Sequence, residues 1–532
     1  MNVTDLLHIT RPLQKRGKYE GKLGRLVLDS RTVRKNDVFI ALRGEKSDGH
    51  HFIGDAVRKG AMVIIAEQIP GEKSKNGQSP EAVLPEDRLI IQVANTMNIV
   101  GELAQNFAGY PAESMKMIGV TGTNGKTTVS TLVYQVLKSL GYNAGLLSTV
   151  DTRIGDRIEE SRLTTPDAVT LASLLNEMSN VDTAFAVMEV SSHALEQQRV
   201  GGIRFDVAAF TNISQDHLDY HRDMDAYINA KRRLFLSLDR EAVAVVNRDD
   251  PAYVRITEGC HAEIWEFGFQ DDKDFRILDE GPEGMVLDLD GMIVSTPLAG
   301  RYNAYNVAQA YLICLAAGCS KYNVAAALGD TYGAPGRMER VVLEKSAGPV
   351  SHKSTMPSVF VDYAHTPDAL DHVLQALHEA RRKGQMLHVV FGCGGDRDRT
   401  KRSKMGHIAD QYADVITLTS DNPRTEDPQS IIRDIREGIT RNDHLFIEPD
   451  RRKAIRAAIL DADTRTMVLV AGKGHENYQE VHGRRKKFDD RKVVAGALSE
   501  WVDRRLPGKN SPGGADKKIT GGLNRNKKKR VN

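Results

Sequence analysis

The sequence predicts an α/β protein of three domains with open, mostly parallel sheets. The chain has 532 residues, a length that suits two to four domains. Short apolar runs that end in polar clusters alternate with stretches of helical spacing, which is typical of a parallel sheet covered on both faces. A glycine-rich loop between one predicted strand and the helix that follows it is a further sign of this fold class.

The first predicted domain comprises residues 1–112. Its predicted strands are the apolar runs 26–28, 38–42, 62–65 and 89–91. Residues 96–108 show the apolar spacing of a helix. The segment Tyr110-Pro111-Ala112 indicates a linker to the next domain. We therefore expect a small α/β domain here.

The central domain, predicted at residues 113–339, begins with a candidate phosphate loop. A buried strand at 115–120 leads into a glycine-rich turn, and residues 127–140 have helical spacing. Backbone N–H groups and the positive end of the helix attract an anion, and Lys126 adds a full charge. The hydroxyl of Thr127 or Thr128 can coordinate Mg²⁺. The loop departs from the strict P-loop, which has glycine where this chain has Val120, and a glycine turn without a ligand is the alternative.

Polar residues follow three more predicted strands of this domain, at 184–188, 207–210 and 242–246. Ligands of parallel sheets bind beyond the carboxyl ends of the strands. Glu189 and His217 therefore become candidates for Mg²⁺, directly or through water, although each alone also suits a hydrogen-bonded loop. Arg337 lies at the predicted hinge to the third domain and either reaches a γ-phosphate or is an ordinary surface arginine.

The third domain, predicted at residues 340–506, repeats this organisation. The predicted strands are 359–361, 388–391, 415–418 and 467–470, and we expect an exposed loop at 344–357. Asp421 and Arg424 stand on one proline turn and together suit the ammonium and carboxylate of an amino acid. Glu476 suits a further ammonium. The alternative is a turn closed by its own salt bridge.

Composition excludes several other classes of protein. The chain is 40% hydrophobic and 27% charged, and no apolar run reaches the length of a membrane span. Four scattered cysteines do not indicate a disulfide framework or a zinc site. The composition of residues 507–532, with eight Lys or Arg and one Asp, predicts a disordered basic tail. We expect a cytoplasmic monomer with free thiols that neither inserts into membranes nor binds nucleic acid.

Taken together, the motifs resemble the Mur ligase family from about residue 24 to residue 503. The motifs are Asp29-Ser30-Arg31, the loop 121–127, Thr164-Thr165-Pro166, the segments 189–193, 216–221 and 362–367, and Gly472-Lys473-Gly474-His475-Glu476. The loop is the family's own variant, which explains the departure at Val120. The resemblance implies a UDP-binding domain, a central ATPase domain and a C-terminal Rossmann-like amino-acid domain.

The resemblance also implies a reaction, that of the ligases adding the third residue of the peptidoglycan stem peptide. The D-Glu γ-carboxylate of UDP-MurNAc-L-Ala-D-Glu attacks ATP, and an amino group then displaces phosphate from the acyl phosphate. Such a protein serves cell wall synthesis, and with it cell shape and division. Catalytic roles fall to Lys126, Lys231, His217 and Arg337.

The resemblance further implies binding residues. ATP would contact Gly122, Thr123, Asn124, Gly125, Lys126, Thr127, Thr128, Asn306, Arg337 and Asp362. UDP-MurNAc-dipeptide would contact Ser30, Thr164, Thr165, Ser191, Gln197, Arg199 and Lys231. Mg²⁺ would be served by Thr127, Glu189, His217 and Lys231, the last as a carbamate.

The third substrate implied by the resemblance is meso-diaminopimelate. Its site would comprise Arg397, Asp421, Asn422, Pro423, Arg424, Gly472 and Glu476. L-Lysine is the alternative, but it lacks the distal carboxylate that Arg424 would bind. Two other functions remain: a related ligase such as a folylpolyglutamate or cyanophycin synthetase, and a nucleotide-binding regulator without catalysis. The motif at Asp29 argues against the first, and retention of the catalytic set argues against the second.

Overall fold

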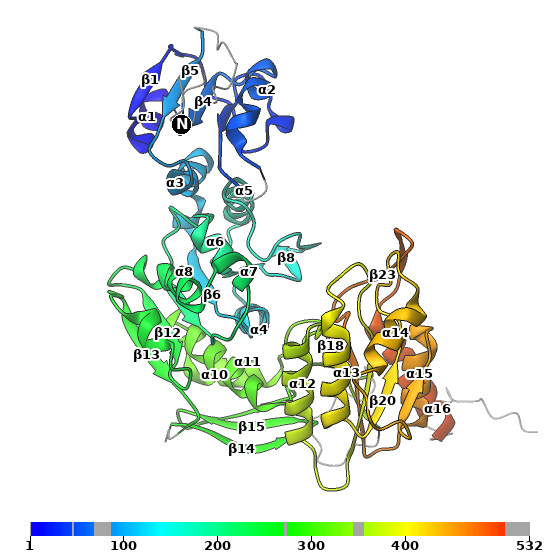
Figure 1. Cartoon of the computed structure of the whole chain (residues 1–532). Coiled ribbons are helices and arrows are strands. Elements are labelled where there is room, and N and C mark those ends of the chain that lie inside the picture. Colours follow the sequence, from blue (N-terminus) through cyan, green and yellow to red (C-terminus); the bar gives the residue numbers. More distant parts are fainter. Residues whose placement is uncertain (1, 45–46, 69–86, 271–273, 344–355, 506–532) are drawn as a thin grey trace, which may run out of the picture.

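The computed structural model describes residues 2–44, 47–68, 87–270, 274–343 and 356–505. Most of the predicted loop at 344–357 and all of the predicted tail at 507–532 lie outside the described residues. Three α/β parts follow one another along the chain, and the C-terminal part lies beside the central one (Figure 1). Within the described ranges, no helix is both long enough and apolar enough to cross a membrane.

The N-terminal part has a five-stranded sheet with the order β1-β5-β4-β3-β2. Its strands are β1 Gln14–Arg16, β2 Leu26–Val27, β3 Val38–Ile40, β4 Val63–Ala66 and β5 Leu89–Gln92. Its helices are α1 Val3–Thr10, α2 Ile53–Arg58 and α3 Met97–Ala108. The four predicted strands and the predicted helix are confirmed. Strand β1, which pairs antiparallel with β5, was not predicted, because its Gln-Lys-Arg residues are all exposed and give no apolar signal.

The central part contains an eight-stranded sheet with the order β13-β12-β11-β6-β10-β7-β8-β9. The strands are β6 Lys116–Thr121, β7 Ala144–Leu147, β8 Asp151–Ile154, β9 Arg157–Glu160, β10 Phe185–Glu189, β11 Val207–Phe210, β12 Val243–Asn247 and β13 Glu263–Phe267. The predicted strands are confirmed, and the strands from β13 to β7 run parallel. The sheet is mostly parallel, as the sequence predicts, and its exceptions lie at one edge, where β8 and β9 are antiparallel additions.

Helices cover both faces of this sheet. They are α4 Lys126–Ser139, α5 Ala168–Ser179, α6 Ser192–Glu196, α7 Leu218–His221, α8 Met224–Leu236, α9 Tyr253–Thr257, α10 Arg301–Ala316 and α11 Lys321–Gly329. One apolar core contains residues of α4, α10 and α11, and the other contains residues of α5 and α8. Helix α5 also reaches the N-terminal core through Ala168 and Ala172, which links the first two parts.

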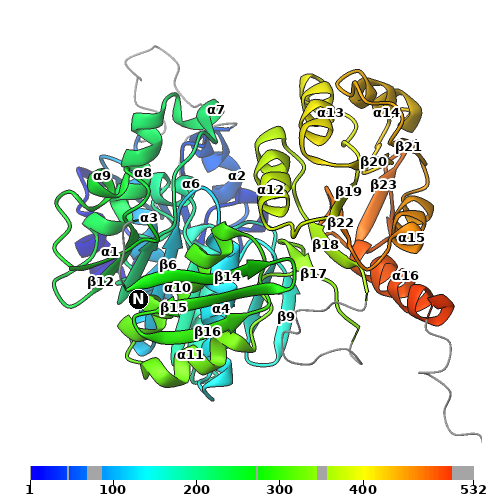
Figure 2. The same ribbon diagram turned by 90° about the horizontal axis from the view of Figure 1, so that it is seen from below.

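A three-stranded antiparallel sheet, β14 Phe275–Gly281, β15 Gly284–Leu289 and β16 Met292–Thr296, lies at the lower edge of the central part (Figures 1 and 2). Met285, Leu287 and Val294 of this sheet enter the core around α4 and α10. The sequence analysis did not predict it. Buried and exposed residues alternate along β16 and are mixed along β14, so these strands lack the continuous apolar runs of the parallel strands.

The C-terminal part has a six-stranded sheet with the order β17-β18-β22-β19-β20-β21. Its strands are β17 Glu339–Arg340, β18 Ser358–Asp362, β19 Met386–Phe391, β20 Val415–Leu418, β21 Leu445–Ile447 and β22 Thr466–Ala471, and a hairpin of β23 Tyr478–Val481 and β24 Arg484–Lys487 follows. The helices are α12 Pro367–Glu379, α13 Thr400–Tyr412, α14 Pro428–Arg436, α15 Arg451–Asp461 and α16 Asp490–Arg505. The four predicted strands are confirmed. Only β17 is antiparallel, and it joins this sheet one residue before the predicted boundary at 340.

A buried ion pair holds two strand ends of this sheet together. Arg451 and Asp490 have fully buried side chains, and Nη2 of Arg451 lies 2.6 Å from Oδ2 of Asp490. The same guanidinium donates to the carbonyl of Ser420 after β20, at 3.4 Å, and to that of Ala471 in β22, at 2.9 Å. Because a buried charge is stable only when paired and hydrogen-bonded, this pair fixes the spacing of the two strand ends.

We expect Asp490→Asn to lower the free energy of unfolding of the C-terminal part by about 3–5 kcal/mol, because it leaves Arg451 buried without a counter-charge. The chain has two tryptophans. In a Trp265→Phe background, the fluorescence of Trp501 in α16 reports urea unfolding of this part alone. The matched control is Glu500→Gln, which breaks the exposed pair with Arg456 and should change stability by less than about 1 kcal/mol. Equal effects of the two substitutions would contradict the assigned role.

Candidate active site

The candidate phosphate loop lies between β6 and α4, as the sequence predicts. Gly122 has φ +148°, and a Cβ atom there would overlap the hydroxyl of Thr211. Gly125 has φ +84°, and its Cβ would lie 2.5 Å from Oδ1 of Asn306. Thr211 Oγ1 accordingly donates to the carbonyl of Asn124, at 2.6 Å. Glycine is therefore required at both ends of the loop, which packs against the ends of β11 and α10.

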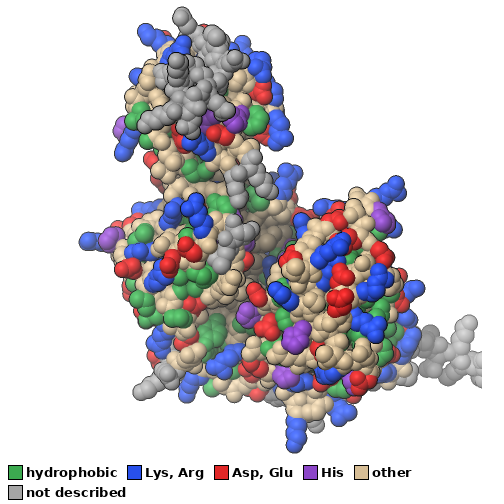
Figure 3. All heavy atoms as spheres, in the orientation of Figure 1, with side chains coloured by type: hydrophobic (Ala, Val, Ile, Leu, Met, Phe, Trp, Pro, Cys, Tyr) green, Lys and Arg blue, Asp and Glu red, His purple; other side chains and the backbone are tan. Residues whose placement is uncertain are grey.

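A cavity of about 460 Å³ lies over this loop. Its lining includes loop residues 122–128 and six side chains from other elements of the central part: Thr149, Thr164, Glu189, Ser191, His217 and Lys231. Arg337, Tyr363 and His365 line its other side, from the hinge and the C-terminal part. The surface is hollowed between these two parts (Figure 3). The structure thus brings most of the predicted ATP and metal residues into one cavity between two domains.

Glu189 is the acidic centre of this cavity. Its side chain is fully buried at the end of β10. Its Oε2 accepts from the hydroxyls of Thr127 and Thr149, each at 3.1 Å, and its Oε1 accepts from the backbone N–H of Thr149 at 2.6 Å. The sequence analysis did not single out Thr149, although it follows β7 at the same sheet edge. These contacts hold the carboxylate beside the hydroxyl of the phosphate loop.

Two lysines share one carbonyl acceptor beside Glu189. The ammonium groups of Lys126 and Lys231 lie 2.9 Å and 2.7 Å from the Gly122 oxygen. Lys231 is 1% exposed, and its Nζ lies 4.4 Å from the ring centre of Tyr227. Burial, and then the charge of Lys126, lower the pKa of Lys231 well below its usual value. Burial likewise lowers the pKa of Lys126, which the Glu189 carboxylate opposes.

His217 stands at the mouth of the cavity. It precedes α7 with φ +53°, and its Nε2 lies 3.5 Å from Oδ2 of Asp216. Its ring packs edge to face on His193, with 4.9 Å between ring centres. Among the described residues, no group of three or more His, Cys, Asp or Glu is arranged to hold a metal.

Arg337 and Asp362 meet where the hinge joins the C-terminal sheet. The guanidinium of Arg337 lies 4.9 Å from the ring centre of Tyr363. Asp362 accepts backbone N–H groups from Met338, at 2.6 Å, and from Ala364, at 2.7 Å. Burial raises the pKa of the Asp362 carboxyl, and Arg337 opposes this. Asp362 thus fixes the hinge, and neither it nor Asn306 is part of the cavity lining.

A second cavity, of about 580 Å³, lies between the N-terminal and central parts. Gln197 and Arg199 line it together with Arg43 and Asp167. Arg199 donates to the carbonyl of Thr165 at 2.8 Å and to Oε1 of Gln197 at 2.7 Å. The predicted residues for UDP-MurNAc-dipeptide are thereby divided, because Thr164, Ser191 and Lys231 line the first cavity. Thr165 joins the two groups, since its hydroxyl donates to the Glu189 carbonyl at 2.8 Å.

Ser30 lies apart from both cavities. It begins a short 3₁₀ helix, Ser30–Thr32, and is 6% exposed. Its carbonyl accepts from Nζ of Lys59 at 3.2 Å. A contact with a uridine nucleotide stays a prediction for this residue.

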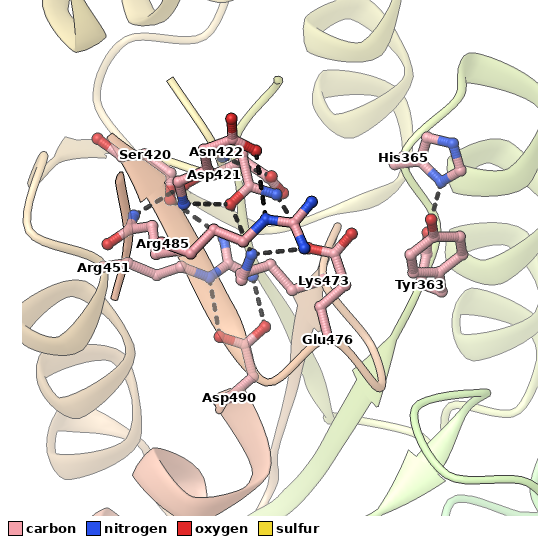
Figure 4. Close-up of polar contacts among 12 residues, drawn as sticks. Tyr363, His365, Ser420, Asp421, Asn422, Arg451, Lys473, Glu476, Arg485 and Asp490 are labelled. Carbon is pink, nitrogen blue, oxygen red and sulfur yellow. Dashed lines mark hydrogen bonds and ion pairs between the residues drawn. The ribbon is translucent and has the colours of Figure 1, made fainter. Parts of the chain in front are cut away.

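The predicted amino-acid turn lies at the end of β20 (Figure 4). Asp421 is 7% exposed, and its Oδ2 is buried without a hydrogen-bond partner in the described part of the chain. Gly472, with φ +118°, lies so close that a Cβ would be 2.5 Å from that oxygen. Asn422 Nδ2 donates to Oε2 of Glu476, at 2.9 Å. Asp421, Asn422 and Glu476 therefore meet as the sequence predicts.

Arg424 is held away from Asp421. Its Nη1 donates to the Gly395 carbonyl at 2.6 Å, and its Nε lies 3.9 Å from Oε2 of Glu480. The alternative prediction of a turn closed by an Asp421–Arg424 salt bridge is therefore wrong. The hairpin explains why, since the N–H of Arg424 donates to the Glu480 carbonyl, at 3.1 Å, and orients the turn. Arg397 is exposed on the neighbouring loop after β19, and Pro423 is buried within the turn.

Sequence reasoning missed three contacts of this turn. Lys473 is fully buried and donates to Oε2 of Glu476 at 2.8 Å. Gln479 Nε2 donates to the Asp421 carbonyl at 2.7 Å, and the N–H of Glu480 donates to Oδ1 of Asn422 at 2.9 Å. Lys473 lies inside a motif already quoted, so its position after β22 was the available signal. The hairpin of β23 and β24 gave no sequence signal, because its strands are partly or fully exposed.

Comparison with known proteins agrees with this arrangement. The chain matches family models described as "Mur ligase family, catalytic domain" over residues 24–108, "Mur ligase middle domain" over 120–314, and "Mur ligase, glutamate ligase domain" over 336–474. Two curated relatives carry the name UDP-N-acetylmuramoyl-L-alanyl-D-glutamate–2,6-diaminopimelate ligase. The protein of Cytophaga hutchinsonii is 38% identical over 93% of this chain and 98% of its own length. That of Geobacillus thermodenitrificans is 40% identical over 89% and 94%.

Solved structures agree as well. A structure titled with the same ligase name is 32% identical, covers 90% of this chain and 95% of its own, and has a TM-score of 0.65. A MurF ligase from Thermotoga maritima in complex with ADP shares the fold, with 18% identity over 91% of this chain and 98% of its own and a TM-score of 0.51. The candidate phosphate loop lies in the matched middle domain and the turn at Asp421 lies in the matched C-terminal domain, and the chain belongs to the Mur ligase family.

Proposed function

We propose that this chain is an ATP-dependent ligase that adds meso-diaminopimelate to UDP-MurNAc-L-Ala-D-Glu in peptidoglycan precursor synthesis. The observation that carries the proposal is the cavity in which the phosphate loop faces Arg337 and Tyr363 across the domain boundary. The UDP-linked dipeptide and diaminopimelate are taken from the names of the relatives described above, which are 38% and 40% identical to this chain. The setting proposed is the cytoplasm, with the protein acting as a monomer in cell wall growth and division.

The proposed reaction has two steps. An oxygen of the D-Glu γ-carboxylate attacks the γ-phosphorus of ATP, which forms an acyl phosphate and releases ADP. The amino group of diaminopimelate then attacks the acyl carbon, so that a C–N bond forms, phosphate leaves and the amine loses a proton. Lys126 and Arg337 oppose the charge that develops on the transferred phosphoryl group.

Mg²⁺ suits the oxygens present in the first cavity. Glu189 already accepts hydrogen bonds from Thr127 and Thr149, so a carboxylate and a hydroxyl lie together at the phosphate loop. One carboxylate plus substrate phosphates is a usual Mg²⁺ environment, and His217 would serve through water. When bound, the metal would neutralise phosphate charge. The protein's own part is to hold the carboxylate and hydroxyl in place.

Lys231 suits the proposed carbamate. Its Nζ is buried 2.7 Å from the Gly122 carbonyl and faces the same cavity as Lys126. The Lys231 ammonium first loses a proton. Its neutral amine then attacks CO₂, an N–C bond forms and a second proton leaves, so a buried cation becomes an anion. That anion would bind Mg²⁺ and relieve the repulsion between two neighbouring ammonium groups.

The preference for diaminopimelate over L-lysine is assigned to Arg424. Diaminopimelate carries a distal carboxylate beside its distal ammonium, and Arg424 and Arg397 would bind the first. The Oδ2 of Asp421, which has no hydrogen-bond partner among the described residues, would bind the second together with Gly472 and Glu476. With lysine, Arg424 would keep a partly buried charge without a substrate partner.

Turnover with each amino acid tests the proposed substrate. With ATP, Mg²⁺ and UDP-MurNAc-L-Ala-D-Glu, the protein should release phosphate on addition of meso-diaminopimelate and much less on addition of L-lysine. A coupled phosphate assay measures both rates. Lys126→Met should lower kcat by about 10²–10³-fold, because a donor to the transferring group is lost, and this variant excludes a contaminating ligase. Faster release with lysine would contradict the assigned substrate.

Removal of the Arg424 charge tests its proposed contact with the distal carboxylate. We expect Arg424→Met to raise the KM for meso-diaminopimelate by about 10- to 100-fold, the loss for a charge-assisted hydrogen bond, with little change for L-lysine. Steady-state kinetics with each amino acid give the ratio. Arg433→Met, at an exposed position on α14, is the matched control and should leave both constants unchanged. A parallel loss with both amino acids would argue against contact with the distal carboxylate.

Removal of CO₂ tests the proposed carbamate on Lys231. Equilibration in CO₂-depleted buffer should lower kcat, and bicarbonate should restore it, because a lysine carbamate loses CO₂ reversibly. Intact-protein mass spectrometry after trapping of the carbamate should locate the added mass at Lys231, and Lys231→Met should carry none. Activity that is indifferent to CO₂ would contradict the assignment.

A further inference from the structure

Lys473 is buried inside the C-terminal site, directly after β22. Its side chain is 0% exposed, and its Nζ donates to Oδ1 of Asn422 at 3.0 Å and to Oε2 of Glu476 at 2.8 Å (Figure 4). Nζ also lies 5.4 Å from the ring centre of Tyr478. A buried ammonium is costly unless it is paired, so these partners hold the lysine in place. With no exposed surface, Lys473 does not touch a substrate itself.

The lysine fixes the orientation of both partners. Asn422 Oδ1 accepts from Lys473 and from the N–H of Glu480, so its Nδ2 must point the other way, where it donates to Glu476 at 2.9 Å. Oε2 of Glu476 therefore receives both Lys473 and Asn422. Two segments distant in sequence meet in this network, the turn at Asn422 and the segment from Lys473 to Glu480. Each polar group in the network has a partner, and each contact depends on the others. The side chains therefore have one mutually consistent arrangement.

The charges of the site give the lysine a second effect. Asp421 and Glu476 are the two carboxylates of the predicted ammonium site, and Lys473 balances one of them. One negative charge remains for a ligand, and the buried Oδ2 of Asp421 has no hydrogen-bond partner among the residues described. Without the lysine, the two carboxylates would repel each other and Glu476 would lose its anchor.

We propose that Lys473 is a positioning residue for the amino-acid substrate, holding Asn422 and Glu476 from within the protein so that the site accepts one distal ammonium group. The proposal rests on the proposed function, since the ammonium is that of diaminopimelate. Lys473 acts through Glu476 and Asn422, and so its removal should weaken amino-acid binding and spare the two other substrates.

The test is a double-mutant cycle of Lys473→Met and Glu476→Gln in the full-length protein, with kcat and the KM of each of the three substrates measured. We expect Lys473→Met to raise the KM for meso-diaminopimelate by about 10- to 100-fold, as for lost hydrogen bonds to charged groups, and to leave the KM for ATP and for the UDP-linked dipeptide within about twofold. The double variant should be no worse than Glu476→Gln alone, because residues of one network do not act additively.

Lys453→Met is the matched control, since Lys453 is exposed on α15 of the same domain. A joint rise of all three KM values, a fall in kcat alone, or full additivity in the cycle would overturn the proposal. If circular dichroism shows that Lys473→Met does not fold, Lys473→Gln keeps a hydrogen-bond donor and should give a smaller rise in the same KM. An unchanged KM in the folded Gln variant would also overturn it. Absence of turnover by the wild-type protein would refute the proposed function itself, and that outcome needs no variant.

Discussion

The carbonyl oxygen of Gly122 accepts from two ammonium groups, and much of the active site depends on this shared contact. Lys126 comes from the first turn of α4 and Lys231 from α8, so the contact ties together three elements at the end of β6. Two ammonium groups at one oxygen, that of Lys231 buried and that of Lys126 partly buried, favour an anion in the cavity. The Glu189 carboxylate lies beside them, and phosphate groups are further anions that suit the cavity.

The loop can make this contact only because its backbone adopts conformations that favour glycine. Gly122 and Gly125 both have positive φ, and side chains there would collide with Thr211 and Asn306. The hydroxyl of Thr211 instead bonds the Asn124 carbonyl. Close packing against β11 and α10 thus decides the loop's shape, and the loop in turn aims N–H groups and Lys126 into the cavity.

A comparable constraint orders the C-terminal site, although it is electrostatic. The Arg451–Asp490 pair holds the ends of β20 and β22, and Lys473 then joins Asn422 on one end to Glu476 on the other. Both cations are fully buried. Buried charge therefore specifies the geometry of this domain where its apolar cores alone would leave the strand-end loops free.

The sequence by itself determined most of the parallel strands, the phosphate loop and two sheet edges with polar residues, because apolar runs and the polar residues that end them are local signals. Glu189 and His217 gather at the edge in the central part, and Asp421 and Glu476 gather at the edge in the C-terminal part. The sequence did not reveal β1, the antiparallel sheet β14–β16 or the role of Lys473. Those strands are partly exposed, and the sequence around a single lysine does not indicate that its side chain is buried. Only the tertiary structure decided which side chains share a cavity: it placed Arg337 opposite Lys126, kept Arg424 from Asp421, and set Asp362 against the hinge backbone, because these contacts join segments far apart in the chain.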